Sequence, residues 1–130
     1  MDLRYRTFFK DFDLPKSVTP DELEPESTHI ALLNGHDLLA YGRLSLLRRG
    51  VYRISQVIVP EPHRSNGYAT LLLNKMVERS KELGASRVEL NAQVSAQKFY
   101  ERCGFVVTIN PYKLKLTGVE HVKMAAALST

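Results

Sequence analysis

Residues 56–69 read Gln56-Val57-Ile58-Val59-Pro60-Glu61-Pro62-His63-Arg64-Ser65-Asn66-Gly67-Tyr68-Ala69. The β-branched run near the start of this segment favours a strand. The polar turn after it leads into residues 68–83, where apolar residues recur at helical spacing. The first backbone N–H groups of a helix have no partner inside it and lie at the positive end of its dipole. The sequence therefore predicts a strand, a turn and a helix, with a turn that can hold a phosphate or pyrophosphate.

The residue types in this turn suit an anionic ligand. Gly67 lets the backbone approach a phosphate with no Cβ in the way, and Ala69 keeps the first helical turn slim. Arg64 adds a positive charge within reach of an anion. A helix start that holds no ligand is the alternative explanation of the same pattern. The segment is not a P-loop, because no Gly-Lys-Ser or Gly-Lys-Thr follows, and it lacks the repeated glycines of a dinucleotide fingerprint.

The chain on either side of this segment alternates between strand-like and helix-like patterns. Strands are predicted at residues 30–33, 38–47, 51–59, 87–92, 105–109 and 119–128, with a hairpin turn at Asn34-Gly35. Gly84 is predicted to end the long helix, and Ser95 to cap a short helix over residues 96–103. The result is a single α/β or α+β domain, residues 1–130, in which two helices are inserted among the strands of a mixed sheet.

The first part of the chain is predicted to differ from the rest. Residues 1–12 are expected to form a short helix with an apolar side made by Leu3, Phe8, Phe9 and Phe12. Residues 16–28 contain prolines and several carboxylates, and this composition predicts an irregular surface loop.

Composition and charge limit the function classes. The chain has 130 residues, of which 44% are hydrophobic and 25% charged, and it contains one cysteine. This predicts a protein of a reducing compartment, which we take to be the cytoplasm, with no membrane-spanning segment and no metal site. The net charge of +4 favours anionic partners, but the basic residues are scattered. We therefore predict no binding to nucleic acid or membranes.

Two motifs identify a resemblance to a known family. Arg64-Ser65-Asn66-Gly67-Tyr68-Ala69 resembles the Arg/Gln-x-x-Gly-x-Gly/Ala pyrophosphate motif of the GNAT superfamily of N-acetyltransferases. Residues 90–105 resemble the second motif of that family, a strand followed by a short helix with a tyrosine and then Gly-Phe. The ElaA-like branch is the most similar, because its Gly-x-x-His-x-x-Met ending matches residues 118–124. The resemblance covers about residues 28–128.

The resemblance implies a fold and a reaction. The fold is a mixed, mostly antiparallel sheet whose central parallel strands splay apart, with flanking helices. The reaction is transfer of an acetyl group from acetyl-CoA to a primary amine. No counterpart of the first strand of the family is predicted in this chain, so we expect that edge to be absent or supplied by another chain. A homodimer through the C-terminal strands is a further expectation. Acceptor specificity is expected in residues 11–28 and 110–117.

The resemblance also implies site residues. The backbone of Val57, Ile58 and Val59 is expected to pair with the pantetheine arm of CoA, and an N–H near Val57 to stabilise the oxyanion. The full set expected to contact CoA is Val57, Ile58, Val59, Arg64, Ser65, Asn66, Gly67, Tyr68, Ala69, Asn91, Phe99 and Arg102. For Asn91, capping of a turn at the strand end is an equal alternative.

Tyr100 is the expected general acid. Thiols titrate at about 8.5 and tyrosine near 10, so a tyrosine remains protonated and can protonate the departing thiolate. The alternative is that Tyr100 packs in the core beside Phe99. Cys103 is rejected as a nucleophile, because no histidine lies near it in the sequence.

The general base is less well defined. The positions near the predicted strand end are Ser55 and Gln56, and neither side chain is a useful base. The remaining candidates are His121, Glu120, Glu89, His29 and solvent; His121 has a suitable unperturbed pKa of about 6.5. Because a carboxylate is missing near Gln56, a second hypothesis stays open: a CoA-binding module without transfer activity that acts as a sensor or assembly part.

Overall fold

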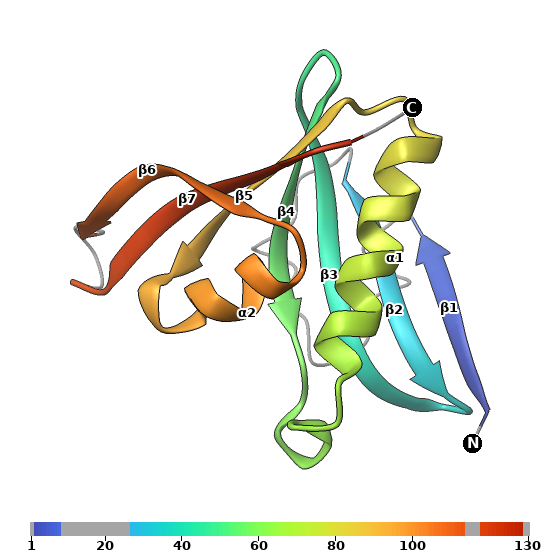
Figure 1. Ribbon diagram of the computed structural model, residues 1–130. Coiled ribbons are helices and arrows are strands. Elements are labelled where there is room, and N and C mark those ends of the chain that lie inside the picture. The colour runs from blue at the N-terminus through green and yellow to red at the C-terminus, as the bar shows by residue number, and fades with distance from the viewer. Residues whose placement is uncertain (1, 9–26, 114–117, 129–130) are drawn as a thin grey trace.

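The computed structural model describes residues 2–8, 27–113 and 118–128, and every structural statement below refers to these residues (Figure 1). The strands are β1 (Leu3–Phe8), β2 (Thr28–Asn34), β3 (Asp37–Arg48), β4 (Val51–Ile58), β5 (Arg87–Gln93), β6 (Val106–Lys113) and β7 (Glu120–Ala127). The helices are α1 (Tyr68–Glu82) and α2 (Gln97–Arg102), with short helical turns at Glu61–His63 and Val94–Ala96. No helix in this part of the chain is long and apolar enough to cross a membrane.

The described strands form one sheet in the order β1-β2-β3-β4-β5-β7-β6. All neighbours are antiparallel except β4 and β5, which run parallel. Pairing of β4 with β5 extends only from Val51 opposite Arg87 to Arg53 opposite Glu89. Beyond these pairs the two strands diverge toward their C-terminal ends, as Figure 1 shows. The predicted mixed sheet with splayed central parallel strands is therefore confirmed.

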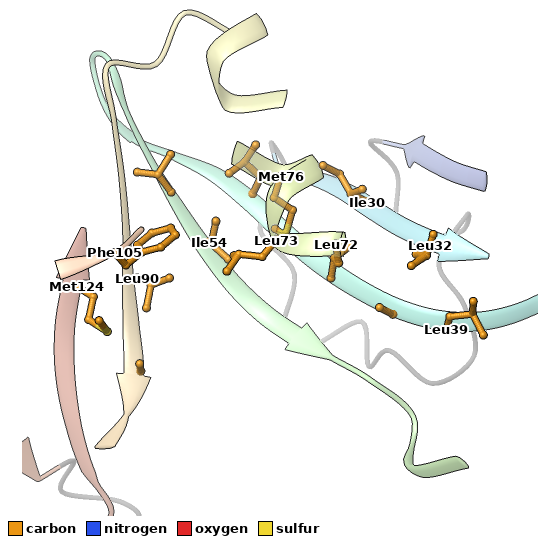
Figure 2. Packing of buried hydrophobic residues seen from close by; sticks show 14 of the residues in the cluster. Ile30, Leu32, Leu39, Ile54, Leu72, Leu73, Met76, Leu90, Phe105 and Met124 are labelled. Carbon is orange, nitrogen blue, oxygen red and sulfur yellow. The ribbon is translucent and has the colours of Figure 1, made fainter. Parts of the chain in front are cut away.

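The hydrophobic core lies between the sheet and the two helices. Helix α1 buries Leu72, Leu73 and Met76 against strands β2, β3 and β4, and all three are fully inaccessible to solvent (Figure 2). Beyond the diverging strands β4 and β5, the side chains of Leu90, Phe105 and Met124 belong to the same cluster (Figure 2). Helix α2 packs against β5, and Tyr100 contacts this cluster. We call the side of the sheet that carries α1 and α2 the helix face.

The prediction for the start of the chain was wrong. Residues 3–8 form the edge strand β1, which pairs antiparallel with β2 from Leu3 opposite Asn34 to Phe8 opposite His29. A short isolated helix is marginally stable, whereas the exposed edge of β2 offers a full row of backbone partners. The Tyr5 hydroxyl also donates to the carbonyl of Leu71 on α1 at 3.2 Å. The edge expected to be missing is thus present within this chain, while residues 9–12 and 16–26 lie outside the described part.

The cap of the short helix also differs from the prediction. Ser95 lies inside the helical turn Val94–Ala96, and α2 begins at Gln97 with Ala96 as its N-cap and no side-chain cap bond. Because Ser95 belongs to the turn that follows β5, it does not occupy the N-cap position of α2. The long helix, the hairpin at Asn34-Gly35 and the other predicted strands lie where the sequence placed them, to within a few residues.

Candidate active site

The diverging ends of β4 and β5 enclose a cavity of about 430 Å³. We call it the central cavity. Its lining residues come from β4, β5, the turn before α2, α2 itself and β7: Ile54, Ser55, Gln56, Val57, Ile58, Leu90, Asn91, Ala92, Gln93, Ala96, Tyr100 and His121. Because no described strand pairs with β4 beyond Arg53 on the β5 side, the backbone groups along this edge face the cavity instead of a neighbouring strand. An extended ligand can pair with such an edge as an added strand.

A β-bulge interrupts β4 at the cavity. Tyr41 pairs with Ile58 and Arg43 with Ser55, so Gly42 alone stands opposite Gln56 and Val57. Gln56 has a φ of 57°, a left-handed conformation that a side chain other than glycine rarely adopts. A bulge leaves its extra residue outside the ladder and re-aims the backbone. The strained position therefore lies where the sequence predicted an oxyanion-stabilising N–H near Val57.

The turn between β4 and α1 is ordered by its own side chains. The Asn66 amide Nδ2 donates to the carbonyls of His63 at 3.1 Å and Arg64 at 3.2 Å. The Arg64 Nε donates to the carbonyl of Val59 at 3.0 Å, which ties the turn to the end of β4. These contacts come from residues predicted to touch the cofactor, and they show that two of them also shape the turn.

This turn, residues 64–67, has the geometry of an anion site. Ser65 and Gly67 both have positive φ angles, 66° and 79°. Gly67 is the N-cap of α1, and no side chain caps the helix. A Cβ added at Gly67 would meet no atom within 4 Å, so the space above the backbone is open. An uncapped helix start with open space at Gly67 is an arrangement that can accept an anion on its first backbone N–H groups.

Tyr100 reaches the central cavity from the helix face. Its ring makes edge contacts with Phe99 and Phe105, with centroids 5.1 and 6.2 Å apart. Burial, and then the neighbouring Cys103, raise the pKa of Tyr100 above its ordinary value of 10.0. The Tyr100 side chain therefore packs in the core beside Phe99, which was the alternative interpretation, and it also lines the cavity as a protonated phenol. The two interpretations of Tyr100 are compatible.

His121 reaches the same cavity from the opposite side of the sheet. His121 pairs with Gln93 across β5 and β7. The next pair, Ala92 and Val122, is buried on the helix face, so His121 and Gln93 lie on the opposite face. The His121 Nδ1 lies 2.8 Å from the carbonyl of Val119. A carbonyl can only accept, so Nδ1 carries the proton and Nε2 holds the lone pair of the neutral ring.

The other candidate bases are placed away from the cavity. Glu89 accepts hydrogen bonds from Arg48 and Arg87, which lower its pKa below the ordinary 4.5. His29 is buried, with its Nδ1 2.6 Å from the Tyr41 hydroxyl. Glu120 is exposed on β7. None of these three lines the central cavity in the described part of the chain.

The remaining predicted residues divide into two groups. Asn91 lines the central cavity, as predicted for a residue near the pantetheine arm. Phe99 and Arg102 do not line it: Phe99 packs on Tyr100, and Arg102 lies exposed in the last turn of α2. Burial raises the pKa of the Cys103 thiol. A raised pKa disfavours the thiolate, which agrees with the rejection of Cys103 as a nucleophile.

Two features of the site were not predicted. One is the pair of positive φ angles at Gln56 and Ser65, which no residue preference indicates. The other is Arg43, which is 7% exposed and donates from Nε to the Ser55 hydroxyl at 3.0 Å, while its Nη1 has no hydrogen-bond partner among the described residues. Strand alternation places Arg43 on the opposite face from Leu44, and this signal was available in the sequence, whereas its pairing with Ser55 depends on the register of β3 and β4. Among the residues described, no group of three His, Cys, Asp or Glu side chains lies close enough to hold a metal ion.

Comparison with known proteins agrees with this geometry. The family model described as "Acetyltransferase (GNAT) family" matches residues 1–105. The chain belongs to the GNAT acetyltransferase family. An uncharacterized N-acetyltransferase of Bacillus subtilis, YjcF, is 30% identical to this GNAT chain over 122 residues, which cover 94% of it and 86% of YjcF.

Solved structures give the same result. The crystal structure of Escherichia coli ElaA has a TM-score of 0.70 and 28% identity, over 89% of this chain and 79% of ElaA. The predicted likeness to ElaA is therefore confirmed. A Bacillus subtilis acetyltransferase in complex with CoA has a TM-score of 0.79 over 98% of this GNAT chain and all of the other, and its 18% identity shows a common fold.

Proposed function

We propose that residues 1–130 form one N-acetyltransferase domain, which binds acetyl-CoA and transfers its acetyl group to a primary amine. One observation carries the proposal. Tyr100 and His121 enter the central cavity from opposite faces of the sheet, and β4 leads from this cavity directly into the anion-binding turn. An acid and a base on opposite sides of one gap suit direct transfer between two substrates that approach from different faces.

Residues 64–69 and the free edge of β4 are the proposed donor site. The turn would hold the pyrophosphate through backbone N–H groups, and the edge at residues 57–59 would pair with the amides of the pantetheine arm. Arg64 would keep its bond to Val59, so it adds positive charge without leaving its place. A structurally similar Bacillus subtilis acetyltransferase forms a complex with CoA, which supports CoA as the ligand class.

The transfer step assigns one proton movement to each side chain. The neutral amine attacks the thioester carbonyl, forming the C–N bond, and the C–S bond then breaks. His121 Nε2 takes the proton that the amine loses, and the Tyr100 hydroxyl gives a proton to the departing sulfur. The backbone at the Gln56–Val57 bulge is proposed to stabilise the charge that develops on the carbonyl oxygen. Acetyl-CoA supplies the activated acetyl group, and the protein places the acid, the base and the backbone of the bulge around it.

A second candidate function rests on the composition of the cavity. No Asp or Glu side chain is among the described residues that line it, so it lacks a carboxylate base. A CoA-binding module without transfer activity, acting as a sensor or assembly part, would have the same turn and the same open strand edge. Activity measurements separate the two.

The test is turnover on a panel of primary amines, followed by mass spectrometry of the acetylated amine and the CoA formed. We expect turnover that Tyr100→Phe lowers by about 100-fold or more, mainly in kcat. Tyr52→Phe is the matched control, because Tyr52 packs against the core on β4 and does not line the cavity. Binding of acetyl-CoA without turnover on any amine would favour the second candidate. Equal turnover in both tyrosine variants would remove Tyr100 from the mechanism.

A further inference from the structure

A second cavity, of about 500 Å³, lies next to the central cavity. We call it the basic cavity. Its lining residues come from β3, β4, β5, β6 and β7: Leu47, Arg48, Arg53, Arg87, Glu89, Leu90, Asn91, Thr108, Ile109, Lys123 and Met124. It shares Leu90 and Asn91 with the central cavity, so the two are continuous along β5.

The basic cavity opens on the side of the sheet away from α1 and α2. Pairs in register across a sheet share a face, and Asn91 stands opposite Lys123 as Gln93 stands opposite His121. The next pair along the two strands, Leu90 opposite Met124, belongs to the core under the helices and so lies on the other face. His121 and Lys123 therefore project from β7 on one face, and that face is the one on which His121 meets the central cavity.

The charge of the basic cavity is strongly unbalanced. Its lining holds four cationic side chains and one carboxylate, Glu89. Arg48 and Arg87 are both engaged with this carboxylate, at 2.8 and 2.7 Å. Lys123 forms no ion pair with another described residue. The buried Arg43, on the same face beside Ser55, adds a further positive charge, and its Nη1 has no partner in the part of the chain that the structure describes. Such a site attracts an anion and repels a bare cation.

We propose that the acceptor is an amine that also carries an anionic group, a carboxylate or a phosphate, and that Lys123 binds this group. The inference rests on the proposed function, since the amine end is the one that would meet His121. Residues two apart on a strand are separated by about 7 Å, so the amine and the anion should lie about that far apart. An extended chain of about four methylene groups spans this distance, because each carbon–carbon bond adds roughly 1.3 Å.

The walls of the basic cavity suit such a chain. Leu47 and Ile109 are 39% and 49% exposed, which leaves apolar surface available to methylene groups. Asn91 lies between the two cavities and presents an amide where the chain would pass. Glu89 does not oppose the anion, because its charge is compensated by two arginines. The pattern thus selects an ω-amino acid or its phosphonate analogue over a simple alkylamine.

The first experiment compares acceptors that differ only in the anionic group. Pentylamine, 5-aminopentanoate and 4-aminobutylphosphonate are offered with saturating acetyl-CoA. We expect kcat/KM for 5-aminopentanoate to exceed that for pentylamine by about 10- to 100-fold, mainly through KM. Similar use of the phosphonate would show that either anion is accepted, and its rejection would narrow the class to carboxylates. Equal kcat/KM for pentylamine and both anionic amines would overturn the proposal.

The second experiment assigns the anion to Lys123. Lys123→Gln should raise the KM for 5-aminopentanoate by about 10-fold or more and leave that for pentylamine unchanged. Lys81→Gln is the control, because Lys81 is exposed near the end of α1, away from both cavities. Equal effects of the two substitutions on both acceptors would contradict the assignment.

A third measurement separates failure of this inference from failure of the proposed function. Binding of 5-aminopentanoate to the protein alone is followed by NMR chemical-shift changes, for the unmodified protein and for Lys123→Gln. Binding that Lys123→Gln abolishes supports the anion site even if no turnover is found, in which case only the proposed function fails. Turnover on pentylamine without any such binding leaves the function standing and refutes the anion site.

Discussion

Gly42 lies on β3, opposite the bulge of β4, and packs against α1, the helix that follows the proposed anion-binding turn. A Cβ at this position would lie 2.5 Å from Met76 Sδ, 2.8 Å from Met76 Cε and 3.3 Å from Leu72 Cδ2. Ordinary contacts of these atoms are about 3.5–4.0 Å, so the methyl group of alanine is short of space by about 1 Å. Met76 and Leu72 are both fully buried. We therefore expect Gly42→Ala to destabilise the protein by about 1–3 kcal/mol.

Urea unfolding of a double-mutant cycle tests this explanation. Met76→Ala alone should cost about 2–5 kcal/mol, because it leaves a cavity in the core. In the double variant the new methyl group lies where Met76 was, so the total cost should fall short of the sum by about 1 kcal/mol or more. Gly42→Ala should also weaken acetyl-CoA binding under folding conditions, since α1 must shift relative to β4. A Gly42→Ala variant as stable as the unmodified protein, or strict additivity in the cycle, would refute the close approach of α1 to β3.

Three further predictions concern the strained backbone at Gln56 and the titratable side chains of Glu89 and Tyr100. Gln56→Gly should be more stable than Gln56→Ala by about 1 kcal/mol in urea unfolding, the reverse of the ordinary strand preference, because position 56 has a positive φ; the ordinary order would mean that the bulge is not strained. Glu89 has a lowered pKa, so its ionised form adds stability that is present above the unfolded-state pKa and is lost as the pH falls through the folded-state pKa. The stability difference between the unmodified protein and Glu89→Gln should be constant from about pH 7 to 5 and shrink below about pH 4.5; a difference that persists at lower pH would contradict the ion pairs. Burial raises the pKa of Tyr100, so kcat should not fall through deprotonation of this side chain up to about pH 10. A decrease of kcat near pH 8–9 that Tyr100→Phe abolishes would contradict the burial of Tyr100.

Much of the fold was accessible from the sequence because local and long-range signals agree. The β-branched run before the turn, the helical spacing of α1 and the Asn34-Gly35 turn each have one dominant interpretation, and the structure follows them. Residues 3–8 carry a weaker signal that suits both a helix and a strand. The outcome there depends on β2, whose free edge provides backbone partners that no local pattern reveals. Tertiary pairing decided between the two.

The candidate site was predictable in its residue types and less so in its geometry. The motif spacing indicated Tyr100, Asn91 and His121, and the structure brings all three to one cavity, although their roles stay predictions. The charged side chains that line the basic cavity come from four different strands, so no single segment of the sequence predicts its charge. Acceptor specificity was expected in residues 11–28 and 110–117, much of which lies outside the described part, whereas the basic cavity offers determinants on the sheet itself.

Acetyl-CoA is proposed to bind with its pyrophosphate on the turn before α1. Isothermal titration with acetyl-CoA tests it most directly, on the unmodified protein, Gly67→Glu and Gly84→Glu. Both glycines have positive φ angles, 79° and 90°, and a Cβ at either would meet nothing within 4 Å, so the two substitutions strain the backbone alike. Only Gly67 adjoins the proposed pyrophosphate, where an added carboxylate should weaken binding by about 10- to 100-fold or more. Binding that Gly67→Glu abolishes and Gly84→Glu preserves is the predicted result. No binding by the unmodified protein, or equal binding by both variants, would show that the pyrophosphate does not lie on this turn.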